Sequence, residues 1–299
     1  MNFTRTQLLG LVGSYVGICG AAYVYVRRRD PPSAKDQDGL DFSKSETFDQ
    51  LADSYDSRLG WDETVMGLKL LRWWIIRQAK GDVLEISAGT GRNIPYYKPS
   101  SVSSLTFTDK SKYMLWHAKQ KYDVQLRSKA EKAGVPVSFA LSDAEHLCNS
   151  SQPAEGVSEP DPGHNRSGFG SEGQTFPAQS FDTIIDTFGL CSHADPEAAL
   201  QEAARACKPG GQIFLLEHGR ASYDWLNKIL DDSAAGHHYR WGCWWNRDIE
   251  ALVSKAGLEV VSMQRWHFGT TYQIVAKPAT DLAKGSADQT TVANIAIEA

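Results

Sequence analysis

The sequence lacks several features that assign many proteins to a class at once. It has no basic excess, because its formal net charge is −5, so electrostatics give no reason to expect a nucleic-acid partner. Its five cysteines are scattered and form no Cys-x-x-Cys pair, so their spacing supports neither a zinc site nor a disulfide framework. No internal repeat is visible in the 299 residues. We therefore expect reduced thiols, no metal and no nucleic acid.

Two familiar nucleotide-binding motifs are also missing from the stretch that carries the strongest signal. Residues 83–93 read Val-Leu-Glu-Ile-Ser-Ala-Gly-Thr-Gly-Arg-Asn, which predicts a buried strand running into a glycine turn. A nicotinamide fingerprint needs a third glycine where Ile94 stands, and a P-loop needs lysine where Arg92 stands. The turn still resembles the nucleotide-binding corner of an open α/β sheet, because Gly89 and Gly91 let the backbone approach a ligand.

The N-terminal end contains a long uncharged run. Residues 8–26 carry no charge over nineteen positions, close to the ~20 residues that cross the hydrocarbon core of a bilayer. Three arginines at 27–29 favour a domain on the cytosolic or matrix side. Gly13 and Gly17 form a Gly-x-x-x-Gly pattern, which suits packing against a partner membrane helix. A cleaved signal peptide is the alternative, but no convincing cleavage site follows, so we predict an uncleaved anchor over residues 1–29.

The rest of the chain divides by composition. Residues 30–45 are polar and predict a linker that tethers a domain near the membrane. The domain itself is expected over residues 46–278, and residues 279–299 read as a flexible tail. Within the domain, residues 149–175 are rich in Ser, Gly, Pro, Glu and Gln and predict a disordered insertion, either merely tolerated or used to bind a partner.

The domain alternates apolar strand-like runs with amphipathic segments. Alternation of this kind predicts a parallel sheet with helices on both faces. Residues 112–132 are expected to be mostly helical, and a helix is expected to start at Asp195-Pro196. Two closely spaced runs, residues 258–266 and 271–276, predict a closing hairpin that adds an antiparallel strand.

Two acidic residues follow later strands at positions suited to a nucleotide. Asp109 ends the expected strand at residues 104–108, twenty-four positions after Glu85, where an acidic side chain accepts hydrogen bonds from ribose hydroxyls. Asp143 and Ala144 follow the expected strand that ends at Leu141. The alternative for each carboxylate is a solvated strand end or a helix cap.

These landmarks, taken in order, resemble class I S-adenosylmethionine-dependent methyltransferases. The first motif of that family is acidic-x-Gly-x-Gly-x-Gly, and residues 85–91 align with it except that Ser87 replaces the first glycine. Later landmarks resemble the ubiquinone/menaquinone-methyltransferase-like branch, and they read Phe181-Asp182, Lys208-Pro209-Gly210-Gly211 and Glu217-His218. The resemblance covers roughly residues 46–277 and implies a Rossmann-like fold with a mostly parallel, seven-stranded sheet.

The chain looks most similar to small membrane-anchored members of this branch. One set is the fungal mitochondrial inner-membrane methyltransferase-like suppressors of Oxa insertase mutants, and the other is the animal membrane-bound thiol methyltransferases. The shared segments are the anchor, Leu190-Cys191-Ser192, Leu216-Glu217-His218 and Gly242-Cys243. The sequence of residues 87–93 is more similar to that of the fungal set. This resemblance implies a single-pass protein of the mitochondrial inner membrane, with the endoplasmic reticulum membrane as the alternative.

The resemblance also implies S-adenosylmethionine as cofactor and a small lipophilic acceptor, either a thiol or a quinone-like ring. Glu85 would orient the methionine end of the pocket, Asp109 would hold the ribose, and Asp143 would bond the adenine amine with Ala144 against the ring. Ser87 is expected to tighten the pocket without closing it. The alternative is a catalytically weak or inactive membrane scaffold or assembly factor, which Ser87 and the membrane glycines motivate.

The acceptor side of the site is less defined. His193 and His218 are candidate bases because imidazole titrates near neutral pH, although a capping or hydrogen-bonding role fits equally well. Cys191 and Cys243 are interpreted as small buried residues, because methyl displacement needs no covalent enzyme intermediate. The aromatic segment at residues 237–245 has three open interpretations: an acceptor lid, a surface resting on the bilayer, or core packing.

Overall fold

The structure is a computed structural model that describes residues 66–148 and 173–279, with five more positions at Phe48, Ala52, Asp56, Glu63 and Thr64. The predicted anchor at residues 1–29 and linker at 30–45 lie outside the described residues, as do nearly all of the predicted insertion and tail. Among the helices that are described, none is long and apolar enough to cross a membrane.

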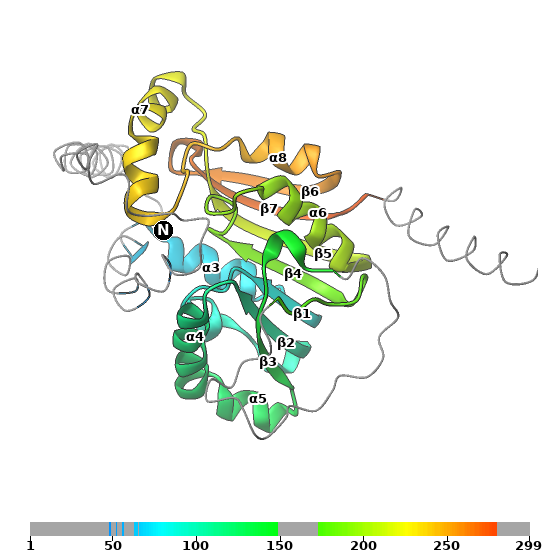
Figure 1. Cartoon of the computed structure of the whole chain (residues 1–299). Coiled ribbons are helices and arrows are strands. Elements are labelled where there is room, and N and C mark those ends of the chain that lie inside the picture. Colours follow the sequence, from blue (N-terminus) through cyan, green and yellow to red (C-terminus); the bar gives the residue numbers. More distant parts are fainter. Residues whose placement is uncertain are drawn as a thin grey trace, which may run out of the picture.

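A twisted sheet in the order β3-β2-β1-β4-β5-β7-β6 forms the centre of the domain (Figure 1). The first five strands of this order pair in parallel, whereas β7 is antiparallel to both of its neighbours, β5 and β6. The strands are β1 (Gly81–Ile86), β2 (Val102–Asp109), β3 (Val137–Leu141), β4 (Phe181–Thr187), β5 (Cys207–His218), β6 (Leu258–Trp266) and β7 (Thr271–Pro278). The predicted mostly parallel, seven-stranded sheet with an inserted antiparallel strand is confirmed.

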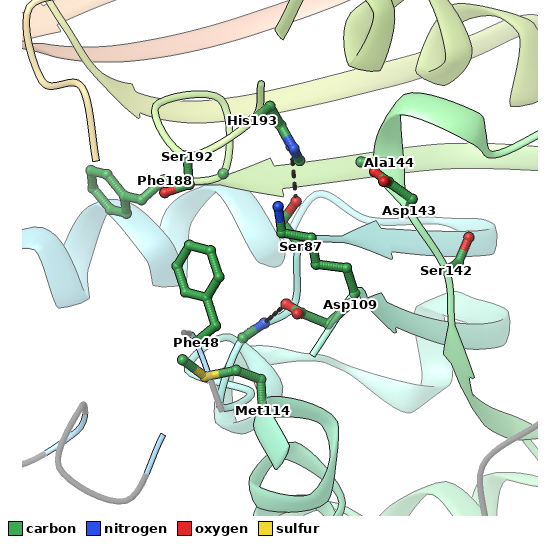
Figure 2. Close-up of a pocket in the computed structure, with 13 residues that line it drawn as sticks. Phe48, Ser87, Asp109, Met114, Ser142, Asp143, Ala144, Phe188, Ser192 and His193 are labelled. Carbon is green, nitrogen blue, oxygen red and sulfur yellow. Dashed lines mark hydrogen bonds between the residues drawn. The ribbon is translucent and has the colours of Figure 1, made fainter. Parts of the chain in front are cut away.

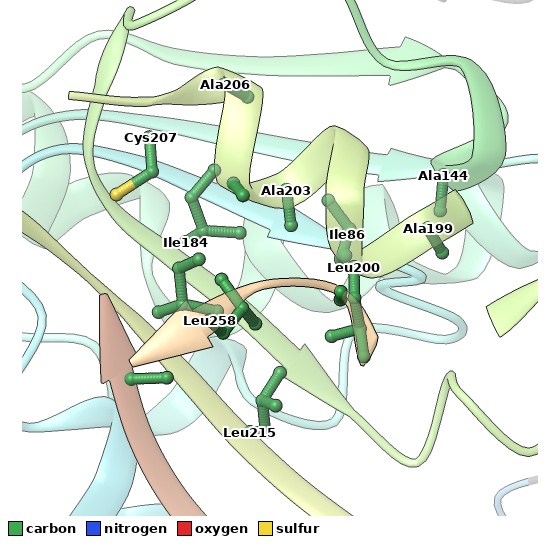
Figure 3. Packing of buried hydrophobic residues seen from close by; sticks show 14 of the residues in the cluster. Ile86, Ala144, Ile184, Ala199, Leu200, Ala203, Ala206, Cys207, Leu215 and Leu258 are labelled. Carbon is green, nitrogen blue, oxygen red and sulfur yellow. The ribbon is translucent and has the colours of Figure 1, made fainter. Parts of the chain in front are cut away.

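Helices cover both faces of this sheet, as alternation predicted. The described helices are α3 (Leu68–Ile76), α4 (Lys112–Gln125), α5 (Arg127–Ala133), α6 (Pro196–Ala206), α7 (Asp224–Trp241) and α8 (Ile249–Lys255). On one face, α6 buries Leu200 and Ala203 against strand residues such as Ile184 and Leu215 (Figure 3). Helix α8 adds Ile249 to the same cluster. On the other face, the side chains of α3, α4 and α5 pack over Val83 and Phe107.

The helices confirm one prediction and add one element that was not predicted. The expected helical stretch at residues 112–132 is two helices, α4 and α5, which meet at Leu126. Helix α7 was not predicted, because its buried positions such as Leu230 and Ala234 are sparse while Trp225 is 60% exposed, so no continuous apolar stripe marks it. It stands apart from the helices that cover the sheet (Figure 1).

The strand order places a crevice beside the first strand. From β1 the chain moves outward to β2 and β3, and then returns to lay β4 on the other side of β1. Ligands of open α/β sheets bind where the order reverses in this way, outside the carboxyl ends of the strands. The chain leaves both strands through residues of left-handed conformation, Ser87 with φ of 53° and Phe188 with φ of 59°. The candidate site lies between these two turns.

Candidate active site

The turn after β1 uses its two glycines for different purposes. Gly89 has φ of 55°, and a Cβ built on it would meet nothing closer than the Ser87 carbonyl oxygen at 4.0 Å, so the backbone faces open space. Gly91 has φ of 75°, but a Cβ there would lie 2.5 Å from Ile94 Cδ1 and 2.9 Å from Ala118 Cα. Gly89 therefore leaves room for a ligand, whereas Gly91 allows α4 to pack closely against the turn.

Asp109, at the end of β2, holds the glycine turn in place. Its Oδ2 accepts a hydrogen bond of 2.8 Å from the backbone nitrogen of Gly89, and its Oδ1 accepts one of 2.9 Å from the nitrogen of Ser111. Because Ser111 caps α4, a single carboxylate ties the turn to the start of the next helix. The side chain also lines the pocket (Figure 2), so it can both shape the turn and accept hydrogen bonds from a ligand.

The end of β3 supplies the opposite corner of the pocket. Asp143 caps the short 3₁₀ helix η3 (Ala144–His146), and its Oδ1 accepts a hydrogen bond of 3.0 Å from the backbone nitrogen of Glu145. Ala144 is buried and, like Ser142, lines the same pocket. A carboxylate next to a small apolar wall suits a flat ring that carries an amine at its edge.

A third wall comes from the turn after β4. Phe188, Gly189, Ser192 and His193 line the pocket from this side (Figure 2). The Ser87 Oγ lies 3.1 Å from His193 Nε2, so the two turns are joined across the crevice by a hydrogen bond. Ser87 therefore narrows this part of the pocket, while Gly89 beside it stays open.

His193 is a neutral imidazole at physiological pH. Burial, assisted by the positive charge of Lys110, lowers the pKa of His193 to about 4. Its Nδ1 is buried without a hydrogen-bond partner among the described residues, and the nearest acidic oxygen, Glu145 Oε1, is 3.9 Å away. A histidine in this state is a weak proton acceptor, and it is better suited to orienting a group than to removing a proton from a weakly acidic acceptor.

Apolar side chains complete the pocket. Phe48, Met114 and Phe188 lie along it in Figure 2, and the Lys110 ammonium lies 5.4 Å from the centre of the Phe48 ring. Sequence reasoning did not single out these residues. Contact between such distant segments leaves no local pattern in the sequence, so Phe48 and Phe188 could not be assigned to the pocket beforehand.

Glu85 lies beneath the turn and does not line the pocket. It is 1% exposed, and its carboxylate accepts hydrogen bonds of 3.0 Å from Asn93 Nδ2 and 2.5 Å from the Tyr97 hydroxyl. Burial raises the pKa of Glu85 to about 7, although these two hydrogen bonds and the charge of Arg72 oppose the rise. The side chain thus supports the glycine turn from below, and the expected contact with a methionine end would have to come through the backbone.

A buried arginine extends this support. Arg72 on α3 is 4% exposed and donates to Asn93 Oδ1 at 2.9 Å and to Thr187 Oγ1 at 2.7 Å. It also forms an ion pair of 2.9 Å with Glu63 and lies 4.9 Å from the centre of the Phe188 ring. One side chain therefore links α3, the turn after β1 and the end of β4.

The second candidate base, His218, lies outside the pocket lining. It ends β5, its Nε2 is 2.7 Å from Cys243 Sγ, and its ring packs edge-on against Phe188 at 5.4 Å. Cys191 and Cys243 are buried, as the sequence suggested. The aromatic segment forms the end of α7 and the loop after it, where His237 stacks on Trp245 with ring centres 3.8 Å apart. Both residues are half-buried, and the contact lies within the segment itself.

The predicted cofactor residues thus fall into two groups. Ser87, Gly89, Asp109, Asp143 and Ala144 meet around one pocket, whereas Glu85 and Gly91 support it from behind. The pocket fits a nucleoside, because an open glycine backbone, two carboxylates and a small apolar wall converge there.

Comparison with known proteins agrees with this geometry. A family model described as "Methyltransferase domain" matches residues 59–263. The mitochondrial methyltransferase OMS1 of Saccharomyces cerevisiae is 38% identical over 237 residues, which are 79% of this chain and 46% of the yeast protein. The chain therefore spans about half the length of that relative. A ubiquinone/menaquinone biosynthesis C-methyltransferase, UbiE of Xanthomonas campestris pv. campestris, is 43% identical over 61 residues, 20% of this chain and 24% of that enzyme.

A solved structure shares the fold. The complex of DhpI with S-adenosylhomocysteine superposes with a TM-score of 0.51 at 16% identity, over 80% of this chain and 96% of that one. At this identity the likeness concerns the fold, and the family assignment follows from the matched domain instead. The chain belongs to the class I S-adenosylmethionine-dependent methyltransferases, with S-adenosylmethionine as their cofactor.

Proposed function

We propose that the chain transfers a methyl group from S-adenosylmethionine to a small lipophilic acceptor, a thiol or a quinone-like ring, as a membrane-anchored protein of the mitochondrial inner membrane. One observation carries the proposal. The pocket has polar corners for a nucleoside, Asp109 and Asp143, and a more apolar side formed by Phe48, Met114 and Phe188. This apolar surface suits an acceptor that is itself largely apolar.

The chain's own residues would bind and align the reactants. Asp109 would accept hydrogen bonds from the ribose hydroxyls, and Asp143 would accept one from the adenine amine with Ala144 against the ring. When bound, S-adenosylmethionine supplies an electrophilic methyl group on its sulfonium, so the protein has to position the acceptor and exclude water. Phe48 and Phe188 supply apolar surface for that exclusion.

The site contains no strong general base among its described residues. His193 is the nearest candidate, and its pKa of about 4 leaves it neutral but weakly basic. An acceptor that ionises easily, such as a thiol, needs less help from a base than an alcohol or an amine does. This difference favours a thiol or an acidic quinol over other lipophilic acceptors.

Two observations support the membrane and the organelle. Residues 8–26 carry no charge and are followed by three arginines, the pattern of a single membrane span. The yeast relative is a mitochondrial protein by its name and is 38% identical to this chain. The membrane-helix partner expected at Gly13 and Gly17 remains part of this proposal.

Calorimetry of the full chain with S-adenosylhomocysteine tests the cofactor site. We expect binding by the wild type and at least a tenfold weaker affinity for Asp109→Ala, because bonds to a charged acceptor contribute about 1.5–3 kcal/mol. Glu259→Gln is the matched control, since it removes an exposed carboxylate of β6 that pairs with Lys277. Absence of binding by the wild type would refute the proposal.

A labelled-methyl assay in lipid vesicles then tests the acceptor. We expect label on hydrophobic thiols or quinols and none on matched alcohols. If the chain binds S-adenosylhomocysteine but labels no acceptor in the panel or in mitochondrial membrane extracts, the scaffold or assembly-factor alternative takes its place.

Alkaline extraction of mitochondria tests the anchor. The full chain should stay in the membrane pellet, whereas Val16→Arg should release a large fraction, because an arginine at the centre of a span costs about 3 kcal/mol. Equal extraction of the two proteins would contradict anchoring through residues 8–26.

A further inference from the structure

Three side chains that are far apart in the sequence meet behind the apolar side of the pocket. Cys191 lies in the turn after β4, His218 ends β5, and Cys243 follows α7. One donor atom from each lies within 4.8 Å of the other two, and the two thiols are 2% and 5% exposed. The two cysteine loops are joined by a hydrogen bond of 2.9 Å from the Trp244 nitrogen to the Cys191 oxygen, which fixes the thiols on facing segments.

The donor set and its dimensions suit a small tetrahedral cation. Zinc–sulfur bonds of about 2.3 Å and zinc–nitrogen bonds of about 2.0 Å place tetrahedral donors roughly 3.5–3.8 Å apart. The three donor atoms lie within 4.8 Å of one another, so small movements would bring them to these separations. His218 Nε2 and Cys243 Sγ are now 2.7 Å apart, so the imidazole would move by about 1 Å to admit the ion. Two thiolates and one imidazole favour zinc or another thiolate-loving ion over magnesium or calcium.

Two buried carboxyl groups close to the cluster leave oxygen atoms unpaired, which is an independent observation about this region. Asp186 and Glu217, at the ends of β4 and β5, are both 0% exposed. Both carboxyl oxygens of Asp186 and one of Glu217 have no hydrogen-bond partner among the described residues. Glu217 Oε1 accepts a hydrogen bond of 3.4 Å from the nitrogen of Gly189, in the turn that carries Cys191. A divalent ion held by this turn would reduce the cost of leaving the carboxyl oxygens buried and unpaired.

We propose that Cys191, His218 and Cys243 bind one zinc-class divalent ion, and that its fourth position takes water or a thiol acceptor. Three protein ligands are typical of catalytic zinc, which keeps one position exchangeable. No other metal-ligating side chain in the described ranges joins the three within the same 4.8 Å. Sequence spacing gave no hint of the site, because the ligands come from a strand end and two different loops.

The site adjoins the methyl-transfer pocket. Two residues of the cluster contact residues that line the pocket. Cys191 Sγ is 3.6 Å from the hydroxyl of Ser192, and the ring of His218 packs against that of Phe188. A thiol bound to the ion would release its proton to solvent and stay as the thiolate, which is the nucleophilic form. This second role rests on the proposed function, whereas metal binding itself does not.

Metal content of the full chain, purified under reducing conditions without chelators, tests the site. We expect about one zinc per chain in the wild type and at least a tenfold loss in Cys191→Ser, Cys243→Ser and His218→Ala. Cys148→Ser and Cys207→Ser are matched controls, because both remove a buried free thiol outside the cluster and should keep the metal. Calorimetry with S-adenosylhomocysteine shows which variants keep their fold.

Cobalt substitution tests the ligands and the open position. Cobalt bound by the wild type should show thiolate charge-transfer absorption, and a small thiol, but not the matched alcohol, should change the visible bands. Three results would overturn the metal site. They are absence of metal in the wild type, retention of metal by the double variant Cys191→Ser/Cys243→Ser, and a Cys191–Cys243 disulfide in protein alkylated at isolation. Unchanged bands on thiol addition would overturn the acceptor role. Metal without S-adenosylhomocysteine binding would instead count against the proposed function alone.

Discussion

Replacement of Glu85 by glutamine gives a direct test of the support under the glycine turn. Glu85 is buried beneath residues that contact the pocket, and its two carboxyl oxygens accept from Asn93 and Tyr97. Glutamine has nearly the same shape but cannot ionise, so it imitates the protonated acid. The comparison therefore isolates the free energy of ionising one buried group.

The size of the effect follows from the pKa of Glu85 in the two states. Its ordinary value of 4.5 applies to the unfolded chain, and burial raises the pKa of Glu85 to about 7 in the folded chain. Between these values the folded state keeps a proton that the unfolded state has lost, so the free energy of unfolding falls by about 1.4 kcal/mol per pH unit. The contribution of Glu85 to the free energy of unfolding is fully present below pH 4.5 and is lost as the pH rises through 7. The free energy of unfolding declines by about 3 kcal/mol over this range.

Urea unfolding followed by tryptophan fluorescence at a series of pH values measures this difference. The free energy of unfolding of the wild type should fall relative to that of Glu85→Gln by about 3 kcal/mol between pH 4.5 and 8. Glu259→Gln, on the exposed edge strand β6, should follow the wild-type curve. Parallel curves for Glu85→Gln and the wild type would show that the folded pKa is not raised and would refute the reasoning.

Two further predictions concern packing around the site. In Gly189→Ala the new Cβ would lie 2.2 Å from Asp186 Oδ1 and 2.8 Å from Ser87 Oγ, so thermal unfolding should show a loss of about 1–3 kcal/mol. Adding Ser87→Gly should recover part of that loss, and strictly additive effects would show that the two residues do not touch. Arg72→Met removes a buried ion pair with Glu63 and should cost about 3 kcal/mol in chemical unfolding, so a change below 1 kcal/mol would contradict the role of Arg72 as a link.

The sheet could be predicted from the sequence because each strand is marked by a pattern of neighbouring residues. The central strands β1 and β4 are short apolar runs buried on both faces, and the glycine turn after β1 follows from residues within one segment. The closing hairpin was equally clear, since two apolar runs lie a few residues apart. Helix α7 escaped prediction because it buries few side chains and so has no periodic stripe.

Contacts between distant segments could not be predicted in the same way. Cys191, His218 and Cys243 are separated by 27 and 25 residues, and only the neighbouring positions of β4 and β5 and the loop after α7 bring them together. The position of Glu85 was inferred from a motif, which aligns residues but does not say on which side of the strand a carboxylate lies. Its neighbours Asn93 and Tyr97 were visible in the sequence, but their hydrogen bonds to it were not.

Ser87 replaces the first glycine of the family motif, and its surroundings indicate whether the site can still bind a ligand. A serine with φ of 53° is strained by about 1 kcal/mol, and its side chain needs the space that Gly189 leaves free. The strain is offset by the hydrogen bond of 3.1 Å between Ser87 Oγ and His193 Nε2, which would be lost with glycine. The pocket remains open at Gly89 and Asp109 beside it. A serine fitted so closely to its neighbours, next to open cofactor positions, favours an adapted site over one that has lost its ligand.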